Sequence, residues 1–282
     1  MRPNETFLKL PKTFWAGVRL ISQKVGYTEK RTGQIKIPST DQIDMKMQEC
    51  GIDFRKWRNR RVGSKRFGIL LDEYFRYRAE ILYTFVEPRL MDVIKAKQIF
   101  EAFHKKLNPS RQVPMNKQSG EKKSPAYLTG LVNMIVEAYS QGLPCDYDPQ
   151  QLTLITRDGL PVRTLARRVD GAFPSSTNPV AIWEIKEYYY TTTFGSRVAD
   201  GIYESLLDGL ELEELKENEN IDVKHCLMID AHDTWWILGK SYLCRVIDML
   251  HMGYLDEVLF GYEVVERLPA LVSEWVEIAK GR

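Results

Sequence analysis

The sequence contains little of what zinc sites and disulfide frameworks require. It has four cysteines and four histidines in 282 residues, and no two cysteines form a Cys-x-x-Cys pair. We therefore interpret the cysteines as small buried apolar residues of a protein in a reducing compartment. They are Cys50, Cys145, Cys226 and Cys244.

Long apolar runs are missing as well. No stretch approaches the roughly 18 to 20 apolar residues that a membrane-spanning helix needs. Residues 1–12 mix charged and polar side chains and lack the apolar centre of a signal peptide. The phosphate-binding motif Gly-x₄-Gly-Lys-[Ser/Thr] is also absent. We therefore expect a cytoplasmic protein without a membrane partner and without an ATP-binding motif.

Charge is distributed unevenly, although the net charge is only +2. Residues 1–125 hold 27 Lys and Arg against 13 Asp and Glu, whereas residues 126–282 hold 13 against 25. Basic surfaces attract the phosphate backbone of nucleic acids, and acidic clusters can hold metal ions. The pattern favours a basic half that binds DNA, but two oppositely charged halves could also simply pack together.

The segment 108–125 is polar, rich in Pro, Lys and Gln, and lies where the charge changes sign. We predict a linker or flexible loop there. It would separate a helical, basic DNA-binding region over 1–107 from a second domain over 126–282, to which the residues discussed below assign a catalytic role.

Two short helices around Gly51 are predicted in the basic region. The first runs to Cys50, and the second, capped by Asp53, covers 54–61. Such a pair favours a helix-turn-helix, whose second helix would read or grip DNA. A charge run is also often just a solvated face. The residues predicted to contact DNA here are Arg55, Lys56, Arg58, Arg60, Arg61, Lys65 and Arg66.

The acidic half, residues 126–282, has a different pattern of apolar residues. The order of its apolar patterns is helix, three strands, helix, strand, helix, and then a strand or short helix. This order predicts an α/β (α+β) fold with a mixed central sheet flanked by helices. The predicted ranges are 126–141, 152–156, 162–173, 180–190, 196–216, 223–229, 240–253 and 254–266.

Three residues on neighbouring predicted strands carry the chemistry. Side chains alternate along a strand, so Glu184 and Lys186 share one face, while Trp183 and Ile185 point to the other. A short connection lets the preceding strand run antiparallel and brings Asp170 to the same end of the sheet. Two neighbouring carboxylates suit Mg²⁺, which typically takes one or two of them and leaves other positions to waters and phosphate.

The tripeptide Asp/Glu-x-Lys occurs five times, but only Glu184–Lys186 lies in an apolar strand with an acid one hairpin earlier. The main-chain carbonyl of Ile185 could be a further metal ligand. Lys186 would position or deprotonate the attacking water and stabilise the negative charge of the phosphate. The alternative is a surface ladder of salt bridges.

The set Asp170, Glu184 and Lys186 resembles the PD-(D/E)XK nuclease superfamily, and especially type II restriction endonucleases, over about residues 126–252. Val169 stands where the name of the motif has Pro. The resemblance implies a restriction-endonuclease-like core and Mg²⁺-dependent, sequence-specific cleavage of double-stranded DNA. It also implies a homodimer and a cognate DNA methyltransferase that acts on the same site.

Further candidates follow from the resemblance. Family members often carry an acid on the helix before the strands, and Glu137 is the candidate, although it could face solvent. In the polar aromatic loop after Lys186, Thr192 and Arg197 are predicted to contact DNA. The tyrosines of that loop could instead pack on the following helix.

Two other functions stay open. One is a non-catalytic DNA-binding regulator whose second domain mediates dimerisation, which would leave the acid and lysine set unexplained. The other is a less specific nuclease of the same superfamily, acting in DNA repair or in defence against phages and mobile elements.

Overall fold

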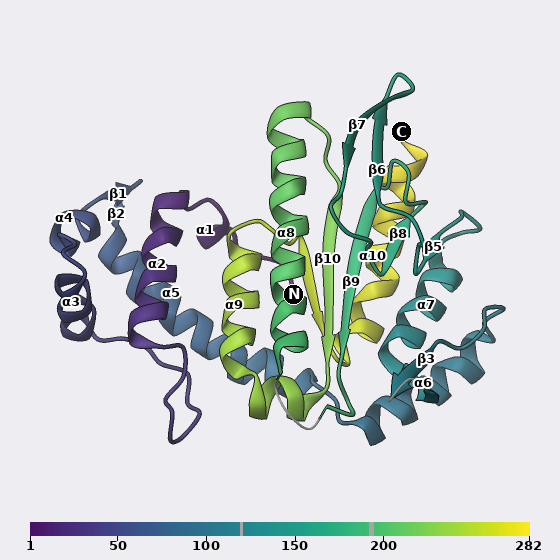
Figure 1. Ribbon diagram of the computed structural model, residues 1–282, viewed down its shortest axis with the longest axis horizontal. Helices are drawn as coiled ribbons and strands as arrows, with labels where there is room; N and C mark the ends of the chain where they lie inside the picture. Colours follow the sequence, from purple (N-terminus) through teal and green to yellow (C-terminus); the bar gives the residue numbers. More distant parts are fainter. Residues whose placement is uncertain (119–120, 192–194) are drawn as a thin grey trace. The chain divides into compact units, whose positions relative to one another are not determined.

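The computed structural model describes residues 1–118, 121–191 and 195–282 and divides the chain into two compact units (Figure 1). Unit 1 consists of residues 1–2, 89–234 and 254–282, and unit 2 consists of residues 3–88 and 235–253. The chain thus passes from unit 2 to unit 1 after Pro88 rather than within 108–125. A second segment, 235–253, returns to unit 2.

Unit 1 is built on a five-stranded sheet with the order β11-β10-β9-β8-β5. β9, β10 and β11 run parallel, whereas β8 is antiparallel to β9 and β5 is antiparallel to β8. The prediction of a mixed central sheet is confirmed. The strands are β5 (Asp146–Tyr147), β8 (Gly171–Phe173), β9 (Ala181–Glu187), β10 (Lys224–Asp230) and β11 (Glu257–Phe260).

Helices cover both faces of this sheet. Figure 1 shows α8 (Ser196–Glu219) in front of the sheet and α10 (Glu263–Lys280) behind it. On the α10 face, Trp183 of β9 stacks on Trp275 with ring centroids 5.5 Å apart, and α7 (Tyr127–Tyr139) completes that core. On the α8 face, Ile182 packs with Leu215. β9 is therefore buried on both sides, which holds its polar residues in place.

Two hairpins and a further helix complete unit 1. The hairpin β6 (Leu154–Arg157) and β7 (Leu160–Thr164) turns at Asp158 and Gly159, both at positive φ, as the Asp-Gly turn predicts. The single strand predicted over 162–173 is wrong. β7 pairs only with β6, so the chain leaves that hairpin before β8 joins β9. The other elements are α6 (Val93–Leu107), β3 (Met115–Gln118) and β4 (Glu121–Pro125), and the short helix η2 (Glu87–Arg89) spans the passage from unit 2 to unit 1.

The segment expected to be a linker contains the hairpin β3–β4, and the helices on either side of it share a core. Phe100 of α6 packs edge-on against Tyr127 of α7, with ring centroids 5.6 Å apart. Gly130 allows this contact, because a Cβ there would lie 2.5 Å from the Phe100 ring.

Unit 2 is helical, with an aromatic core that includes Phe14, Trp15 and Phe67. Its buried Arg78 binds Asp248 of α9 at 3.0 and 3.1 Å, and this pairing offsets the cost of burying both charges. Its elements are α1 (Glu5–Leu8), α2 (Lys12–Val25), α3 (Thr40–Glu49), α4 (Phe54–Arg58), β1 (Arg61–Val62), β2 (Lys65–Arg66), α5 (Phe67–Ile81), η1 (Leu82–Val86) and α9 (Lys240–His251), with η3 (Asp233–Leu238) leading into the second segment.

Within the three described stretches of the chain, every helix is too short or too polar to cross a lipid bilayer.

Candidate functional site

Asp170, Glu184 and Lys186 lie together where β8 pairs with β9. Glu184 and Lys186 are on the α8 side of β9, with Ile182, and both are buried. Asp170 stands just before β8, and its N–H donates to the Trp183 carbonyl at 3.2 Å. Its carboxylate accepts a hydrogen bond of 2.7 Å from the Ile185 N–H. The acid is thus tied to the main chain of the strand that carries the other two residues.

Lys186 lies between two carboxylates. Its Nζ donates to Glu184 Oε2 at 2.7 Å and to Glu204 Oε2, on α8, at 3.1 Å. Gly201 of α8 leaves room for the lysine, because a Cβ there would lie 3.1 Å from Lys186 Cδ. The close packing of α8 on β9 therefore fixes the position of the ammonium group.

Arg167 is a second cation at the site, and it belongs to none of the motifs predicted from the sequence. Its two terminal nitrogens form a bidentate ion pair with the two carboxylate oxygens of Glu184, at distances of 2.8 and 3.0 Å. The same guanidinium contacts Asp208 at 2.6 Å and Glu204 at 3.4 Å. Sequence signals existed: Arg167 stands three residues before Asp170, and Glu204 and Asp208 lie one turn apart on one helix face.

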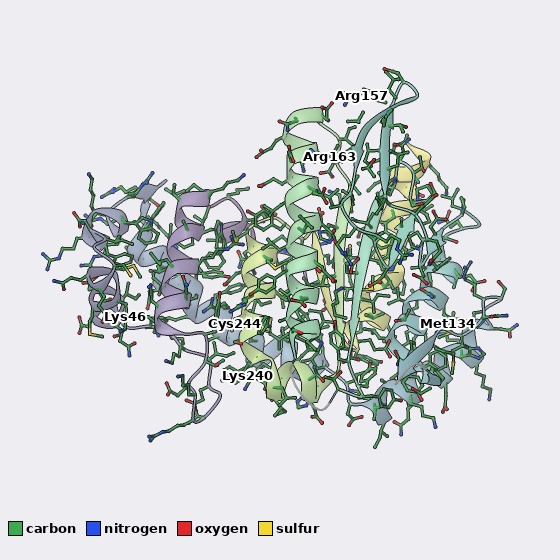
Figure 2. The ribbon with its side chains drawn as sticks, in the orientation of Figure 1. Lys46, Met134, Arg157, Arg163, Lys240 and Cys244 are labelled. Carbon is green, nitrogen blue, oxygen red and sulfur yellow. The ribbon has the colours of Figure 1, made fainter. Side chains whose placement is uncertain are left out.

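Arg167 is one of three arginines that tie the segment from β6 to Asp170 onto α8. Arg157 contacts Glu219 at 2.9 Å, and Arg163 contacts Glu214 at 3.0 Å. Both arginines are labelled in Figure 2, where Arg163 lies between β7 and α8. These two pairs are partly exposed, whereas Arg167 reaches the fully buried Glu184.

The carboxyl groups of the site differ in their pKa values. Burial and the neighbouring Glu184 raise the pKa of Asp170 to about 6, against the opposing effect of Lys186. Burial raises the pKa of Asp208 to about 7 in spite of Arg167. Burial also favours the neutral form of Glu184, but Lys186 and Arg167 outweigh it and hold the Glu184 pKa below its ordinary value. Glu184 is therefore the firmly charged carboxylate.

The donor set fits a hard divalent cation. Asp170 and Glu184 are adjacent, and the repulsion that raises the pKa of Asp170 is what a cation between them would relieve. No group of three or more acidic, His or Cys side chains in the described part of the chain is placed to hold a metal ion. Mg²⁺ needs only one or two protein carboxylates, and the Ile185 carbonyl stays a candidate ligand.

The other predicted residues near this site are not brought to it. Glu137 lies on α7, which packs on the opposite face of the sheet, and its carboxylate accepts a 3.1 Å hydrogen bond from the Ser110 N–H. Thr192 lies outside the described residues, as does the side chain of Arg197. In the loop after Lys186, Tyr189 packs inward and donates to the buried carboxylate of Asp230.

The residues of unit 2 that were predicted to contact DNA lie on α4, on the hairpin β1–β2 and between the two. The prediction of a helix over 54–61 is wrong beyond Arg58, because the chain turns at Gly63, at φ +55°, and forms the hairpin β1–β2. Helices α3 and α4 do form on either side of Gly51, whose φ is +67°. Trp57 of α4 packs against the aromatic core of unit 2, and its indole N–H donates to the Thr13 carbonyl at 3.1 Å.

The structure separates the predicted DNA-contacting cations into two groups. Arg58 contacts Asp44 at 3.4 Å, Lys65 contacts Glu73 at 2.8 Å, and Arg60 lies over the Phe67 ring at 5.7 Å. The other four are exposed and have no acidic partner among the described residues. These free cations are Arg55, Lys56, Arg61 and Arg66.

Comparison with known families gives two matches. A domain of unknown function, DUF7687, matches residues 91–275, and a second one, DUF7690, matches residues 1–85. The DUF7690 match covers nearly all of the first segment of unit 2, whereas the DUF7687 match covers most of unit 1 and also residues 235–253 of unit 2. No curated protein and no solved structure matches the chain.

Proposed function

Because this chain belongs to the DUF7687 family, whose function is unknown, we propose its function from the site itself. The protein is a Mg²⁺-dependent endonuclease that hydrolyses phosphodiester bonds of double-stranded DNA, in the manner of a type II restriction enzyme. The observation that carries this proposal is the buried set of Asp170, Glu184 and Lys186 on adjacent strands of the central sheet. The sequence of helix, strands, helix and strand around it supports a restriction-endonuclease-like core.

Asp170, Glu184 and the Ile185 carbonyl would hold the metal ion. When bound, Mg²⁺ lowers the pKa of a bound water and offsets the charge that develops on the phosphate. In a surface ladder of salt bridges these charged groups would remain exposed to water. Burying them costs free energy, which a purely structural ion pair does not require. The burial of Glu184 and Lys186 therefore favours the catalytic interpretation.

Lys186 acts as a cation in this scheme. Burial alone would favour its neutral form, but Glu184 and Asp170 outweigh burial and hold the Lys186 pKa above its ordinary value. In the site without a metal ion, Lys186 therefore carries its proton. It positions the water and stabilises the phosphate charge through the ammonium group.

DNA would be held by the free cations of unit 2. Arg55, Lys56, Arg61 and Arg66 can meet phosphates without first breaking an ion pair. A palindromic site requires two active sites related by a two-fold axis, so we propose a homodimer. A cognate DNA methyltransferase would protect the same site in the cytoplasm of the host cell.

The test is incubation of long duplex DNA with the protein in Mg²⁺ or in EDTA, beside the variant Glu184→Gln. Discrete fragments that need both Mg²⁺ and Glu184 support the site-specific enzyme. A smear with the same two requirements would replace it with a less specific nuclease of repair or defence. Intact DNA with a mobility shift would overturn the nuclease and favour a DNA-binding regulator.

A further inference from the structure

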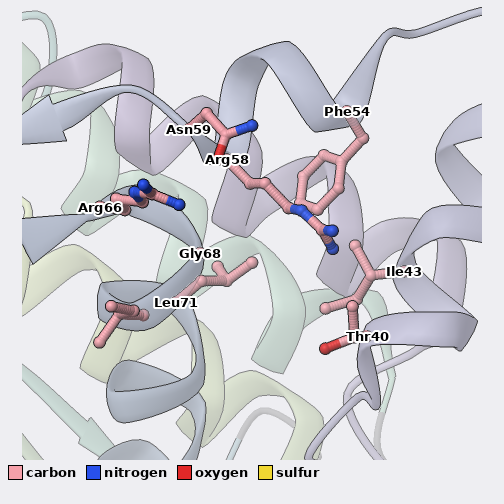
Figure 3. Close-up of a pocket in the computed structure, with 9 residues that line it drawn as sticks. Thr40, Ile43, Phe54, Arg58, Asn59, Arg66, Gly68 and Leu71 are labelled. Carbon is pink, nitrogen blue, oxygen red and sulfur yellow. The ribbon is translucent and has the colours of Figure 1, made fainter.

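A pocket of about 270 Å³ opens in unit 2 among α3, α4, β2 and α5 (Figure 3). For comparison, a cavity of about 150 Å³ is large enough to bind benzene. The pocket therefore has room for a planar ring system with substituents. Its lining combines apolar and polar groups: Ile43, Phe54, Ile69 and Leu71 with Thr40, Arg58, Asn59 and Arg66, beside Gly68.

Arg66, which lines this pocket, stands opposite a second arginine that lies outside the lining, and neither has a counter-charge in the described part of the chain. Arg61 and Arg66 are direct partners across the hairpin β1–β2, so their side chains lie on the same face. Both are exposed, and neither has an acidic partner among the described residues. Like charges directly opposite each other destabilise a hairpin. An anion held between the two guanidinium groups would remove that repulsion, and Arg66 also lines the pocket.

The rest of the pocket suits an aromatic heterocycle. Figure 3 shows the Arg58 side chain extending past the Phe54 ring into the pocket. Asp44, at 3.4 Å from Arg58, holds this guanidinium in place and offsets its charge. The Asn59 amide offers both a donor and an acceptor. Apolar walls can contact the faces of a ring while these groups hydrogen-bond its edge.

We propose that this pocket binds a single nucleotide, with the base inside it and the phosphate between Arg61 and Arg66. The anion site and the ring site are adjacent because Arg66 belongs to both. The ligand is either a free mononucleotide or one nucleotide turned out of a DNA strand, since the two present the same chemistry. The inference rests on unit 2 alone and does not require the nuclease activity.

The hairpin provides a matched pair of variants. Arg66→Ala and Lys65→Ala each remove one exposed positive charge from neighbouring positions. Lys65 lies opposite Val62, on the other face of the hairpin, and is already paired with Glu73 at 2.8 Å. A third variant, Ile69→Ser, reduces the apolar wall at a side chain that is 52% exposed. None of the three removes a buried side chain, so all should fold, as a thermal melt will show.

The first experiment titrates the full-length protein in EDTA with the four deoxynucleoside 5′-monophosphates, deoxyribose 5-phosphate and inorganic phosphate, by calorimetry. We expect at least one nucleotide to bind about tenfold more tightly than the two ligands without a base. Arg66→Ala and Ile69→Ser should each weaken that nucleotide, Arg66→Ala by about tenfold, whereas Lys65→Ala should leave it unchanged. Failure of every nucleotide to bind, or equal weakening by Lys65→Ala, overturns the proposal.

The second experiment separates the two sources of the ligand. It compares a perfect duplex with the same duplex carrying one unpaired nucleotide, again in EDTA. Tighter binding of the unpaired duplex that disappears in Arg66→Ala but not in Lys65→Ala assigns the pocket to DNA. Nucleotide binding in the first experiment without any preference between the duplexes assigns it to a free mononucleotide. No cleavage is measured, so the absence of nuclease activity would leave both results readable.

Discussion

Arg167 holds Glu184 through both arms of its guanidinium, with nitrogen–oxygen distances of 2.8 and 3.0 Å. The same group reaches Asp208 at 2.6 Å and Glu204 at 3.4 Å, so three carboxylates share one cation. A metal ion at Glu184 must therefore compete with Arg167. With the proposed metal ion bound to Glu184, the guanidinium would keep its contacts to the two carboxylates on α8.

Replacement of Arg167 by Gln should strengthen metal binding. The variant removes the positive charge that competes for Glu184, so we expect Mn²⁺ affinity, measured by calorimetry, to rise about tenfold. Without metal the variant should melt at a lower temperature, because Glu184 and Asp208 lose a partner for their buried charge. Added Mn²⁺ should raise its melting temperature more than that of the wild type.

Arg163→Gln is the matched control for this prediction. It removes another arginine–glutamate pair between the same segment and α8, but that pair lies away from Glu184. We expect it to leave Mn²⁺ affinity unchanged. Metal affinity that is equal or lower in Arg167→Gln would show that the arginine positions Glu184 rather than competing for it.

Lys186→Met should abolish most DNA cleavage while DNA binding persists. The substitution keeps the length of the side chain but removes the charge, and loss of one such group at a developing charge typically costs roughly 100- to 1,000-fold in rate. Cleavage rate at saturating DNA and affinity in EDTA are the two measurements. The control is Lys216→Ala, since Glu214–Lys216 has the same tripeptide form but its lysine pairs with Asp222 on the surface. Cleavage that survives in Lys186→Met would contradict the assigned site.

The stability of unit 1 should depend on the protonation of Asp230. This carboxyl group is fully buried, and burial raises its pKa from 3.8 to about 7, against the hydrogen bonds from Tyr189, Met91 and Ala231. The folded state therefore binds the proton more tightly than the unfolded state. That contribution is complete below about pH 4 and is lost as the pH rises to about 7.

Asp230→Asn removes this titration while its amide can serve the same hydrogen-bonding partners. We expect the unfolding free energy of the wild type to fall relative to the variant between about pH 4 and 7, with a slope of at most about 1.4 kcal/mol per pH unit. Denaturant titrations at several pH values measure it. Asp233→Asn, at a side chain that is 85% exposed, should show no such pH dependence. Parallel curves for the wild type and Asp230→Asn would contradict the prediction.

Helix α9 should be required for the stability of unit 2. Asp248 of α9 accepts hydrogen bonds from the buried Arg78 and, at 2.5 Å, from the Tyr74 hydroxyl. Asp248→Ala leaves the guanidinium uncompensated, and such losses cost about 3–5 kcal/mol. The double variant Arg78→Met with Asp248→Leu should recover most of that loss, as urea unfolding will measure. A double variant as unstable as the single one would mean that packing, not charge, dominates at this pair.

The candidate site was predictable from the sequence where it depends on local rules. Alternation along a strand places Glu184 and Lys186 on one face, and a short antiparallel connection brings Asp170 beside them. Several helix and strand types over the acidic half followed from their apolar periods. The exceptions are 162–173, which holds parts of β7 and β8 rather than one strand, and 254–266, which holds β11 and the start of α10 rather than one short element. For the correct predictions, the controlling interaction lies within a few residues of the chain or within one strand pair, so the sequence alone determines it.

Tertiary packing decided the rest. Arg167 reaches Glu184, 17 residues further along the chain, because the chain leaves β7 before β8 joins β9, and the packing of α8 brings Glu204 and Asp208 to the same guanidinium. In the same way, Arg66 remains free while Lys65, one residue earlier, is neutralised by Glu73 on the next helix. A charge is visible in the sequence, but its partner depends on which elements pack together. The sequence alone determined which groups this protein has for its chemistry, and the packing of its helices decided which of those charges are free to act.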